Sequence, residues 1–366
     1  MKEEIAQRLS NLREIMQREH LDAFIFPSTD PHNSEYVPDR WKGREWISGF
    51  NGSAGTAVVT MHAAALWTDS RYFIAAEQQL AGTEFVLMRE RVAGTPTISE
   101  WLGKVLSDIN GATVGVDGMV NTAADVEALI SDLRQQGGIT VRTNFDPLAV
   151  IWTNQPPIPT TPIEVHSLEY AGESTTSKLS RIRMALRSLH ADGMLVSALD
   201  DIAWTLNLRG SDVHCNPVFV SYLLIDTKTT TLFINDEKLT PDVKAYLTAQ
   251  GVQTAPYNHI KDALRNYNEY NILLDPNVIS YTLFKQVRTQ EVVRASSPIP
   301  AMKAIKNEIE VEGFRRAMIR DGVALVKFLR WLQTAVVKGQ ETEISVAEKL
   351  TALRAEQPLF RGISFD

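Results

Sequence analysis

The most regular feature at the start of this chain is the spacing of its apolar residues. Over residues 1–17 the apolar side chains fall at helical intervals: Ile5, Leu9, Leu12, Ile15 and Met16. This spacing predicts an amphipathic helix with one buried face. A short apolar run at 23–26 then predicts a strand. Two runs with β-branched or aromatic residues, 55–60 and 64–67, predict a hairpin, and a helix is expected over 72–80.

The same order of elements returns in the second half of the chain. A strand is expected at 194–197, a hairpin from 218–225 and 231–234, and a helix over 242–250. Four identical pairs lie 170 positions apart: Leu9 and Leu179, Ser10 and Ser180, His20 and His190, Asp22 and Asp192. A duplicated unit of roughly 150 residues predicts two similar domains in tandem. Because helices and strands alternate, each domain should be α/β, a mixed sheet flanked by helices.

Proline-rich segments indicate where these domains end. The run at 155–162 reads QPPIPTTP, which is typical of an extended spacer. A second proline-containing run, SPIP, ends at residue 300. We therefore predict a first domain over 1–158, a second over 159–300 and a different segment over 301–366. In that last segment, the sequence predicts one long helix over 302–337 and the start of another at 341–348. About 60 residues in two helices are too few for a core of their own, so we interpret them as the start of a larger domain.

Composition narrows the class of protein. The chain has 366 residues, 44% hydrophobic and 22% charged, with a net charge of −7. The negative charge argues against nucleic-acid binding. No stretch approaches the roughly 20 apolar residues that a membrane span needs, and the N-terminus does not resemble a signal peptide. The single cysteine, Cys215, excludes an internal disulfide. A cytoplasmic location is therefore expected.

Residues that could carry chemistry are few. None of the seven histidines has the spacing of a zinc-binding helix, so surface or capping roles are expected for them. Glycines at positions 49, 52 and 55 predict a tight turn into the following strand. The neighbouring Asp200 and Asp201 are expected to cap a helix rather than to bind a metal, because adjacent helical side chains diverge.

The segment 67–73, WTDSRYF, is the most informative cluster. Asp69 is expected to cap the helix that follows. Arg71 would then project at a strand-to-helix junction, where its guanidinium could hold a carboxylate or a peptide carbonyl, or form an ordinary salt bridge. From the residues alone, the chain has no catalytic centre: it offers no metal-binding set, no activated nucleophile and no phosphate loop.

Several motifs, in this order, resemble those of a known family. They are SEY at 34–36, GFNGSAGT at 49–56, WTDSRYF at 67–73, IAW at 202–204, NLRGSDV at 207–213, NPVF at 216–219 and KAIKN at 303–307. The whole chain resembles the long, three-domain form of Xaa-Pro aminopeptidase (aminopeptidase P). The resemblance implies two creatinase-N-like domains followed by a "pita-bread" catalytic domain. Family members remove the first residue from peptides with proline second, using two divalent metals, usually manganese.

The resemblance also implies what this chain lacks. The catalytic domain would start near Ala301, so the metal-binding Asp, Asp, His, Glu and Glu of the family would lie beyond Asp366. We therefore expect no catalytic residue, no metal ligand and no bound cofactor in this chain, which would be a truncated and inactive part of the enzyme. The resemblance assigns substrate binding to one residue, Arg71. The expected partners are short peptides with proline second, with no nucleic acid and no membrane.

Other interpretations stay open. A non-catalytic module of creatinase-like fold, binding peptides or proteins or mediating dimerisation, is the main alternative. A prolidase or a creatine-type amidinohydrolase is a weaker one, because the long two-domain N-terminal arrangement argues against it. A homodimer is compatible with the family, and an incomplete third domain would expose an apolar face on Val323, Val326, Phe328 and Leu332.

Overall fold

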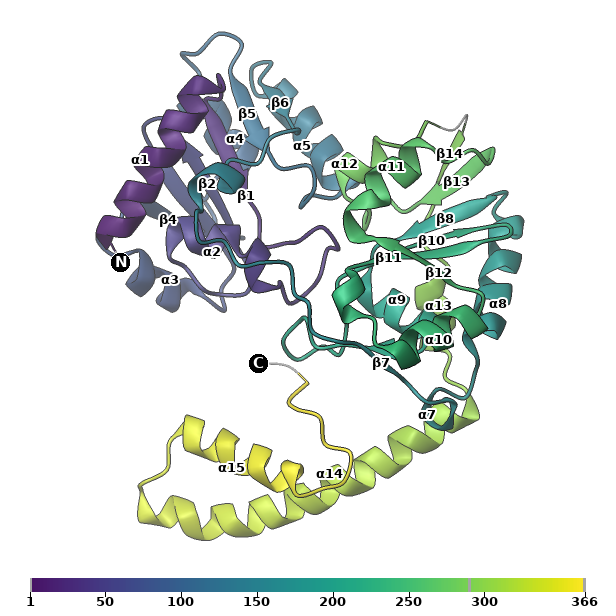
Figure 1. Cartoon of the computed structure of the whole chain (residues 1–366). Helices are drawn as coiled ribbons and strands as arrows, with labels where there is room; N and C mark the ends of the chain where they lie inside the picture. The colour runs from purple at the N-terminus through teal and green to yellow at the C-terminus, as the bar shows by residue number, and fades with distance from the viewer. Residues whose placement is uncertain (1, 289–290, 365–366) are drawn as a thin grey trace.

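The computed structural model describes residues 2–288 and 291–364. The chain forms two α/β domains in succession, and a pair of C-terminal helices extends away from the second domain (Figure 1).

The first domain is built on a six-stranded sheet with the strand order β4-β3-β2-β1-β5-β6. Its strands are β1 (Ala23–Phe26), β2 (Thr56–Thr60), β3 (Ala64–Thr68), β4 (Phe85–Arg89), β5 (Thr113–Val116) and β6 (Thr140–Arg142). The pairs β1–β2 and β2–β3 are antiparallel, whereas β3–β4, β1–β5 and β5–β6 are parallel. The sheet is therefore mixed.

Helices cover both faces of this sheet because its central strands are apolar on both sides. They are α1 (Lys2–Arg18), α2 (Gly43–Ser48), α3 (Phe73–Leu80), α4 (Ile98–Val105), α5 (Ala123–Gln135) and α6 (Leu148–Ile151). Phe24 packs into the core that includes Leu9 of α1, while its neighbour Ile25 packs into the core that includes Leu133 of α5. Adjacent residues of a strand point to opposite faces, so β1 contributes to two cores.

The second domain repeats this architecture with the order β12-β11-β10-β8-β13-β14. Its strands are β8 (Gly193–Val196), β10 (Tyr222–Asp226), β11 (Thr230–Ile234), β12 (Gln253–Pro256), β13 (Asn271–Leu274) and β14 (Glu291–Arg294). Its helices are α8 (Thr175–Ser188), α9 (Leu199–Leu206), α10 (Pro241–Ala249), α11 (Ile260–Arg265) and α12 (Tyr281–Phe284). A two-stranded sheet of β7 (Glu164–Val165) and β9 (Leu208–Arg209) and the short α7 (Leu168–Ala171) complete it. The predicted fold class is confirmed; the exact boundaries at 158 and 300 stay a prediction.

A loop of the first domain enters the second. His32 is 1% exposed, and its Nδ1 lies 3.0 Å from the carbonyl oxygen of Ser197. Its Nε2 lies 2.8 Å from the hydroxyl of Tyr257, and its ring packs against Tyr222 with centroids 4.5 Å apart. A carbonyl can only accept, so Nδ1 carries the proton. Burial lowers the pKa of His32. The expectation that every histidine lies on the surface or caps a helix is therefore wrong for His32, which joins the two domains.

The C-terminal segment differs from the predicted single helix over 302–337. The structure has α13 (Ile299–Ala304), a break, and then α14 (Glu308–Ala335). Asn307 begins α14 by accepting the backbone N–H of Glu310 at 3.0 Å, and the Glu310 carboxylate accepts the backbone N–H of Asn307 at 2.9 Å. This reciprocal capping box satisfies two donors at the new helix start.

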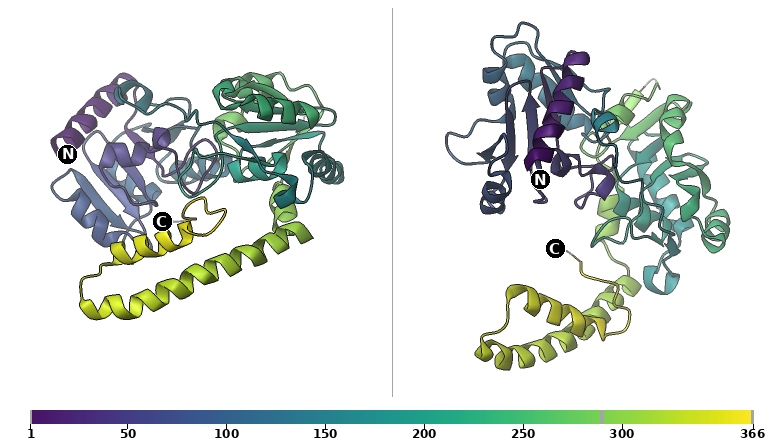
Figure 2. Two further views of the ribbon diagram at one scale, coloured as in Figure 1. Left: turned by 60° about the horizontal axis from the view of Figure 1, so that its bottom comes forward. Right: turned by 60° about the vertical axis from the view of Figure 1, so that its left-hand side comes forward.

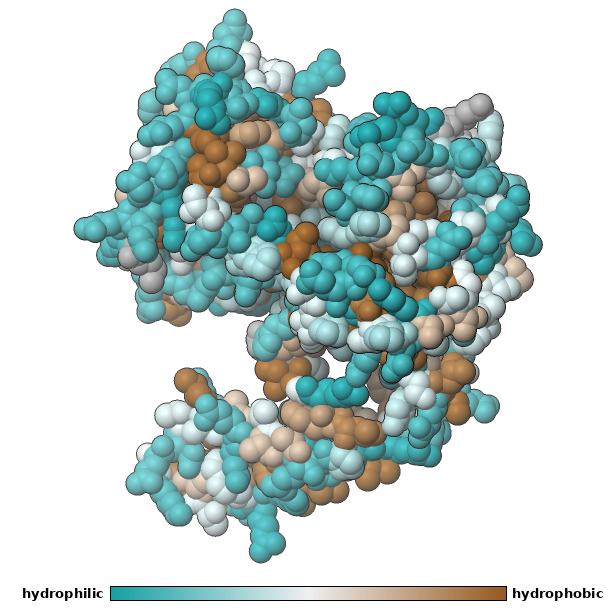
Figure 3. Space-filling model, in the orientation of Figure 1, coloured by the Kyte–Doolittle hydropathy of each residue, from teal (hydrophilic) through white to brown (hydrophobic). Residues whose placement is uncertain are grey.

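The last helix, α15 (Glu343–Ala355), packs along α14, and Figure 1 and the right-hand view of Figure 2 show this pair standing apart from both sheets. Of the predicted apolar face, Val323 and Val326 are exposed, at 44% and 69%. Phe328 is 8% exposed and, with Leu332, packs in the small core between α14 and α15. Hydrophobic residues are visible along the helix pair in Figure 3.

Candidate functional site

Arg71 lies in the turn between β3 and α3, where the sequence places it. The sequence predicts that Asp69 caps α3, but α3 begins only at Phe73 and its first turn has no side-chain cap. Asp69 instead accepts hydrogen bonds from Arg71. The Arg71 side chain is 65% exposed. In Figure 1, α3 lies on the side of the first domain that is turned toward the C-terminal helix pair.

The glycine-containing turn at 49–55 lies beside Arg71. The Ser53 hydroxyl is 2.5 Å from the hydroxyl of Tyr72, the residue after Arg71. A Cβ atom on Gly52 would come within 2.8 Å of the Tyr72 ring, so only glycine fits this close approach. Gly49 ends α2 with a φ of 74°, a left-handed conformation that glycine adopts without strain. Two motifs that are separate in sequence therefore form one surface.

A buried arginine that the sequence analysis missed holds this turn. Arg44 of α2 is 6% exposed and donates to the carbonyl oxygens of Phe50 and Gly52. Its Nε donates to the Ser28 hydroxyl at 2.8 Å, and that hydroxyl donates to the Gly55 carbonyl at 2.6 Å. Burial lowers the pKa of Arg44 to about 10. No motif identifies Arg44, because its partners are two backbone carbonyls and the hydroxyl of Ser28, which form no recognisable pattern along the sequence.

We expect Arg44→Met to destabilise the first domain by about 2–3 kcal/mol, since it removes charge-assisted hydrogen bonds and leaves two buried carbonyls unpaired. Methionine keeps most of the side-chain volume. The free energy of unfolding, from urea titration followed by circular dichroism, measures this cost. Arg18→Met is the control, because the side chain of Arg18 is 62% exposed. Equal unfolding free energies for the two variants would contradict the role given to Arg44.

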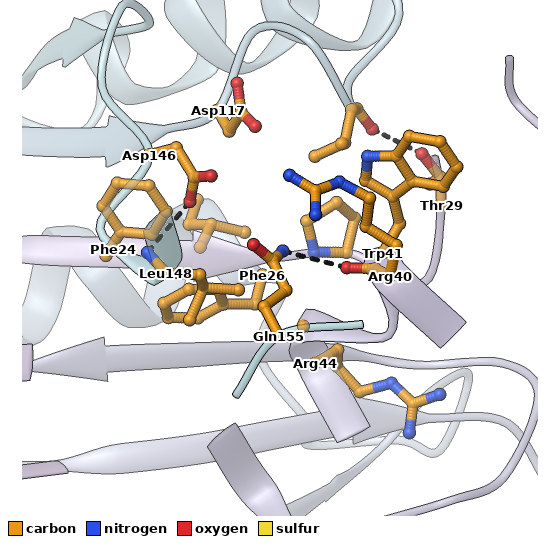
Figure 4. A pocket seen from close by; sticks show the side chains of 14 residues that line it. Phe24, Phe26, Thr29, Arg40, Trp41, Arg44, Asp117, Asp146, Leu148 and Gln155 are labelled. Atoms are coloured by element: carbon orange, nitrogen blue, oxygen red, sulfur yellow. Dashed lines mark hydrogen bonds between the residues drawn. The ribbon is translucent and has the colours of Figure 1, made fainter. Parts of the chain in front are cut away.

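The pocket in Figure 4 lies where β1 and β5 end. Asp117 and Asp146 face it from one side, and the guanidinium of Arg40 lies between these carboxylates and Trp41, whereas Arg44 is turned away. Nη1 of Arg40 donates to the Pro156 carbonyl at 2.9 Å, and Gln155, the first residue of the proline-rich segment, lines the pocket. Its cavity of about 40 Å³ has room for water but not for a peptide.

The pocket disfavours the charged form of both of its carboxyl groups. Burial, together with repulsion from Asp146, raises the pKa of Asp117 to about 7, although the backbone N–H of Met119 donates to it at 2.8 Å. Burial also raises the pKa of Asp146, which accepts the backbone N–H of Leu148 at 2.9 Å. We interpret these residues as part of the connection between the domains rather than as a substrate site.

Asp200 and Asp201 do converge on one cation, contrary to the expectation from their adjacency. Both lie in the first turn of α9, whose N-cap is Ala198. Lys303 of α13 donates to both carboxylates, at 2.7 Å for Asp201. The pair therefore ties the start of the C-terminal segment to the second domain.

The residues do not fit the pair of metal ions that the resemblance implies. Within 2–288 and 291–364, no three His, Cys, Asp or Glu side chains are grouped so that they could hold a metal ion. No catalytic step through a metal is derived for these residues.

None of the helices in the described part of the chain is long and apolar enough to cross a bilayer.

Comparison with known proteins identifies the class. Residues 8–142 match the creatinase/prolidase N-terminal domain, and residues 154–310 match a second model of the same domain. The chain therefore carries two domains of the creatinase/prolidase N-terminal family. Along almost its whole length it is homologous to Xaa-Pro aminopeptidases, which confirms the family predicted from the motifs.

The chain is 38% identical to "Probable Xaa-Pro aminopeptidase P" of Aspergillus niger, over 99% of this chain and 60% of that protein. It is also 38% identical to "Xaa-Pro aminopeptidase 1" of Dictyostelium discoideum, over 99% of this chain and 59% of that protein. The solved X-prolyl aminopeptidase of Caenorhabditis elegans superposes with a TM-score of 0.92 at 30% identity, over 99% of this chain and 61% of its own. That protein is described as a cytosolic enzyme with a di-nuclear active site. The chain thus spans about three-fifths of the length of these relatives.

Proposed function

We propose that this chain is the N-terminal, substrate-positioning part of a cytoplasmic metal-dependent aminopeptidase that removes the first residue from peptides with proline second. The observation that carries the proposal is the superposition of nearly the whole chain on a solved X-prolyl aminopeptidase. The metal ions, manganese by the resemblance, would be held outside the described residues. The chain by itself would then hydrolyse no peptide.

The chemistry of the substrate is consistent with a separate positioning unit. A proline nitrogen has no N–H, and its ring fixes φ, so the bond before proline offers peptidases neither a donor nor flexibility. Such a substrate must be held by groups that do not react with it. Arg71 is suited to this task, because an exposed guanidinium can donate to a peptide carbonyl.

We expect Arg71→Ala in the complete protein to lower kcat/KM for short Xaa-Pro peptides by about tenfold to hundredfold, the effect of losing one charge-assisted hydrogen bond in the transition state. Steady-state kinetics on a tripeptide with proline second measure it. Arg89→Ala, from another exposed ion pair of the first domain with Glu77, is the matched control. Unchanged kinetics in Arg71→Ala would exclude Arg71 from the site.

The decisive experiment compares two polypeptides. This chain and the product of the complete reading frame are each incubated with manganese and a Xaa-Pro tripeptide, and release of the first residue is measured. Turnover by the complete product alone supports the proposal. Turnover by this chain would show that it does contain metal ligands. Binding of the peptide without turnover by either would favour the alternative, a non-catalytic peptide-binding or dimerisation module.

A further inference from the structure

Asp69 holds Arg71 through three hydrogen bonds. Its Oδ1 accepts the backbone N–H of Arg71 at 3.0 Å and the side-chain Nε at 3.0 Å, while its Oδ2 accepts one terminal nitrogen, Nη2, at 2.8 Å. This arrangement is bidentate, which fixes the plane of the guanidinium as a single contact cannot. Exposed ion pairs usually contribute little to stability, so the pair of Asp69 and Arg71 matters because it orients the guanidinium.

The aromatic ring of Tyr72 limits the guanidinium on another side. The Arg71 Cζ lies 5.2 Å from the centre of the Tyr72 ring, a cation–π distance. Tyr72 is itself held by the contact between its hydroxyl and Ser53. An exposed arginine would otherwise sample many rotamers, and restricting them in advance reduces the entropy lost on binding.

The pairing also decides which ligand Arg71 favours. The hydrogen bond from Arg71 lowers the pKa of Asp69, and the same contact raises the pKa of Arg71, so both stay charged. The pair is then neutral as a unit. The other terminal nitrogen, Nη1, has no hydrogen-bond partner within the described residues. A neutral carbonyl can accept from it, whereas a carboxylate gains less from Arg71 than it would from an unpaired arginine, because Asp69 offsets part of the attraction.

On the basis of the proposed function, we propose that Asp69 is a positioning residue. It orients Arg71 and, by cancelling its charge, makes Arg71 bind a peptide carbonyl in preference to a free carboxylate.

The test in the complete protein uses Asp69→Asn, which keeps the size of the side chain but removes its charge. The substrates are one tripeptide with proline second, as the free acid and as the C-terminal amide. We expect KM for the amide to rise about fivefold with kcat within twofold, and the ratio of kcat/KM for acid over amide to rise about tenfold. In the Arg71→Ala background, Asp69→Asn should have no further effect. The control is Glu77→Gln, from the exposed pair with Arg89.

A persistent effect of Asp69→Asn in the Arg71→Ala background, or an acid-to-amide ratio equal to that of the Glu77→Gln control, would overturn the proposal. If the complete protein hydrolyses no Xaa-Pro peptide, the proposed function fails, and a measurement on this chain still decides about Asp69. The NMR signal of the Arg71 Nε–H is followed while the two peptides are titrated. The wild-type chain should respond more to the amide and Asp69→Asn more to the acid; no difference between the two peptides would refute the charge preference.

Discussion

Lys238→Ala should destabilise the second domain by about 3–5 kcal/mol, because it leaves a buried carboxylate without its cation. The side chains of Lys238 and Asp212 are both 0% exposed and form an ion pair. Asp212 also accepts the backbone N–H of Val220 at 2.7 Å. Burial raises the pKa of Asp212 and lowers the pKa of Lys238, so desolvation outweighs their mutual attraction. Neither charge can be buried alone at low cost.

Hydrogen exchange of the β10 amides measures the free energy of unfolding of this domain. Lys244→Ala is the control, because its partner Asp236 and Lys244 itself are well exposed, and it should cost less than about 1 kcal/mol. The double variant Lys238→Met with Asp212→Asn should recover most of the lost stability, since it removes both charges. A loss in Lys238→Ala no larger than that in Lys244→Ala would contradict the role of the buried pair.

Asp212 also shows why the motifs that identify a family need not be its reactive residues. It belongs to the NLRGSDV segment at 207–213, yet its carboxylate serves the interior of the second domain. Asn207 of the same segment ends α9 in a left-handed conformation, with φ 50°, and accepts a hydrogen bond from the buried Lys178 at 2.7 Å. Both residues are structural.

The repeated α/β fold could be predicted because its signals are local. Alternating apolar runs and helical spacing specify strands and helices within a few residues, and the internal repeat then predicts the same strand order twice. The break before α14 was also readable, since Asn307 followed by Glu310 is the signature of a helix start. The spacing of apolar residues predicts one continuous helix instead, because that spacing continues across the break.

Contacts between distant segments could not be read from the sequence. Lys303 reaches Asp200 and Asp201 from about 100 positions away, and Arg40 approaches Asp146 only in the folded chain. His20 and His190, which match in the repeat, do lie at helix ends: both have left-handed backbones, with φ 54° and 55°, after α1 and α8. Their repeated position therefore reflects how each helix ends rather than a shared chemical role.

A second large effect is expected from Asp117→Asn, and it should depend on pH. The pKa of Asp117 is raised to about 7 in the folded chain, against about 3.9 for an unfolded aspartate. A carboxyl group with a raised pKa favours the folded state only while it is protonated. Its contribution is therefore fully present below about pH 4 and is lost as the pH rises to about 7, by about 4 kcal/mol in total. Asparagine does not titrate, so the variant should lack this loss.

The loop after Asp117 forms backbone hydrogen bonds to the second domain, and these bonds can be used to measure the effect. Gly118 accepts the backbone N–H of Thr282 at 2.9 Å, and Asn121 accepts that of Tyr281 at 2.9 Å. Hydrogen exchange of these two amides at pH 4.5 and pH 8 should show Asp117→Asn gaining stability over the unchanged chain as the pH rises. Asp146→Asn should lower the pKa of Asp117, because it removes the repelling charge. The free energy of unfolding should then fall over a narrower pH range than in the unchanged chain. If the free energy of unfolding differs between Asp117→Asn and the unchanged chain by the same amount at both pH values, the pKa of Asp117 is not raised by this pocket. The connection between the domains would then be insensitive to its charge.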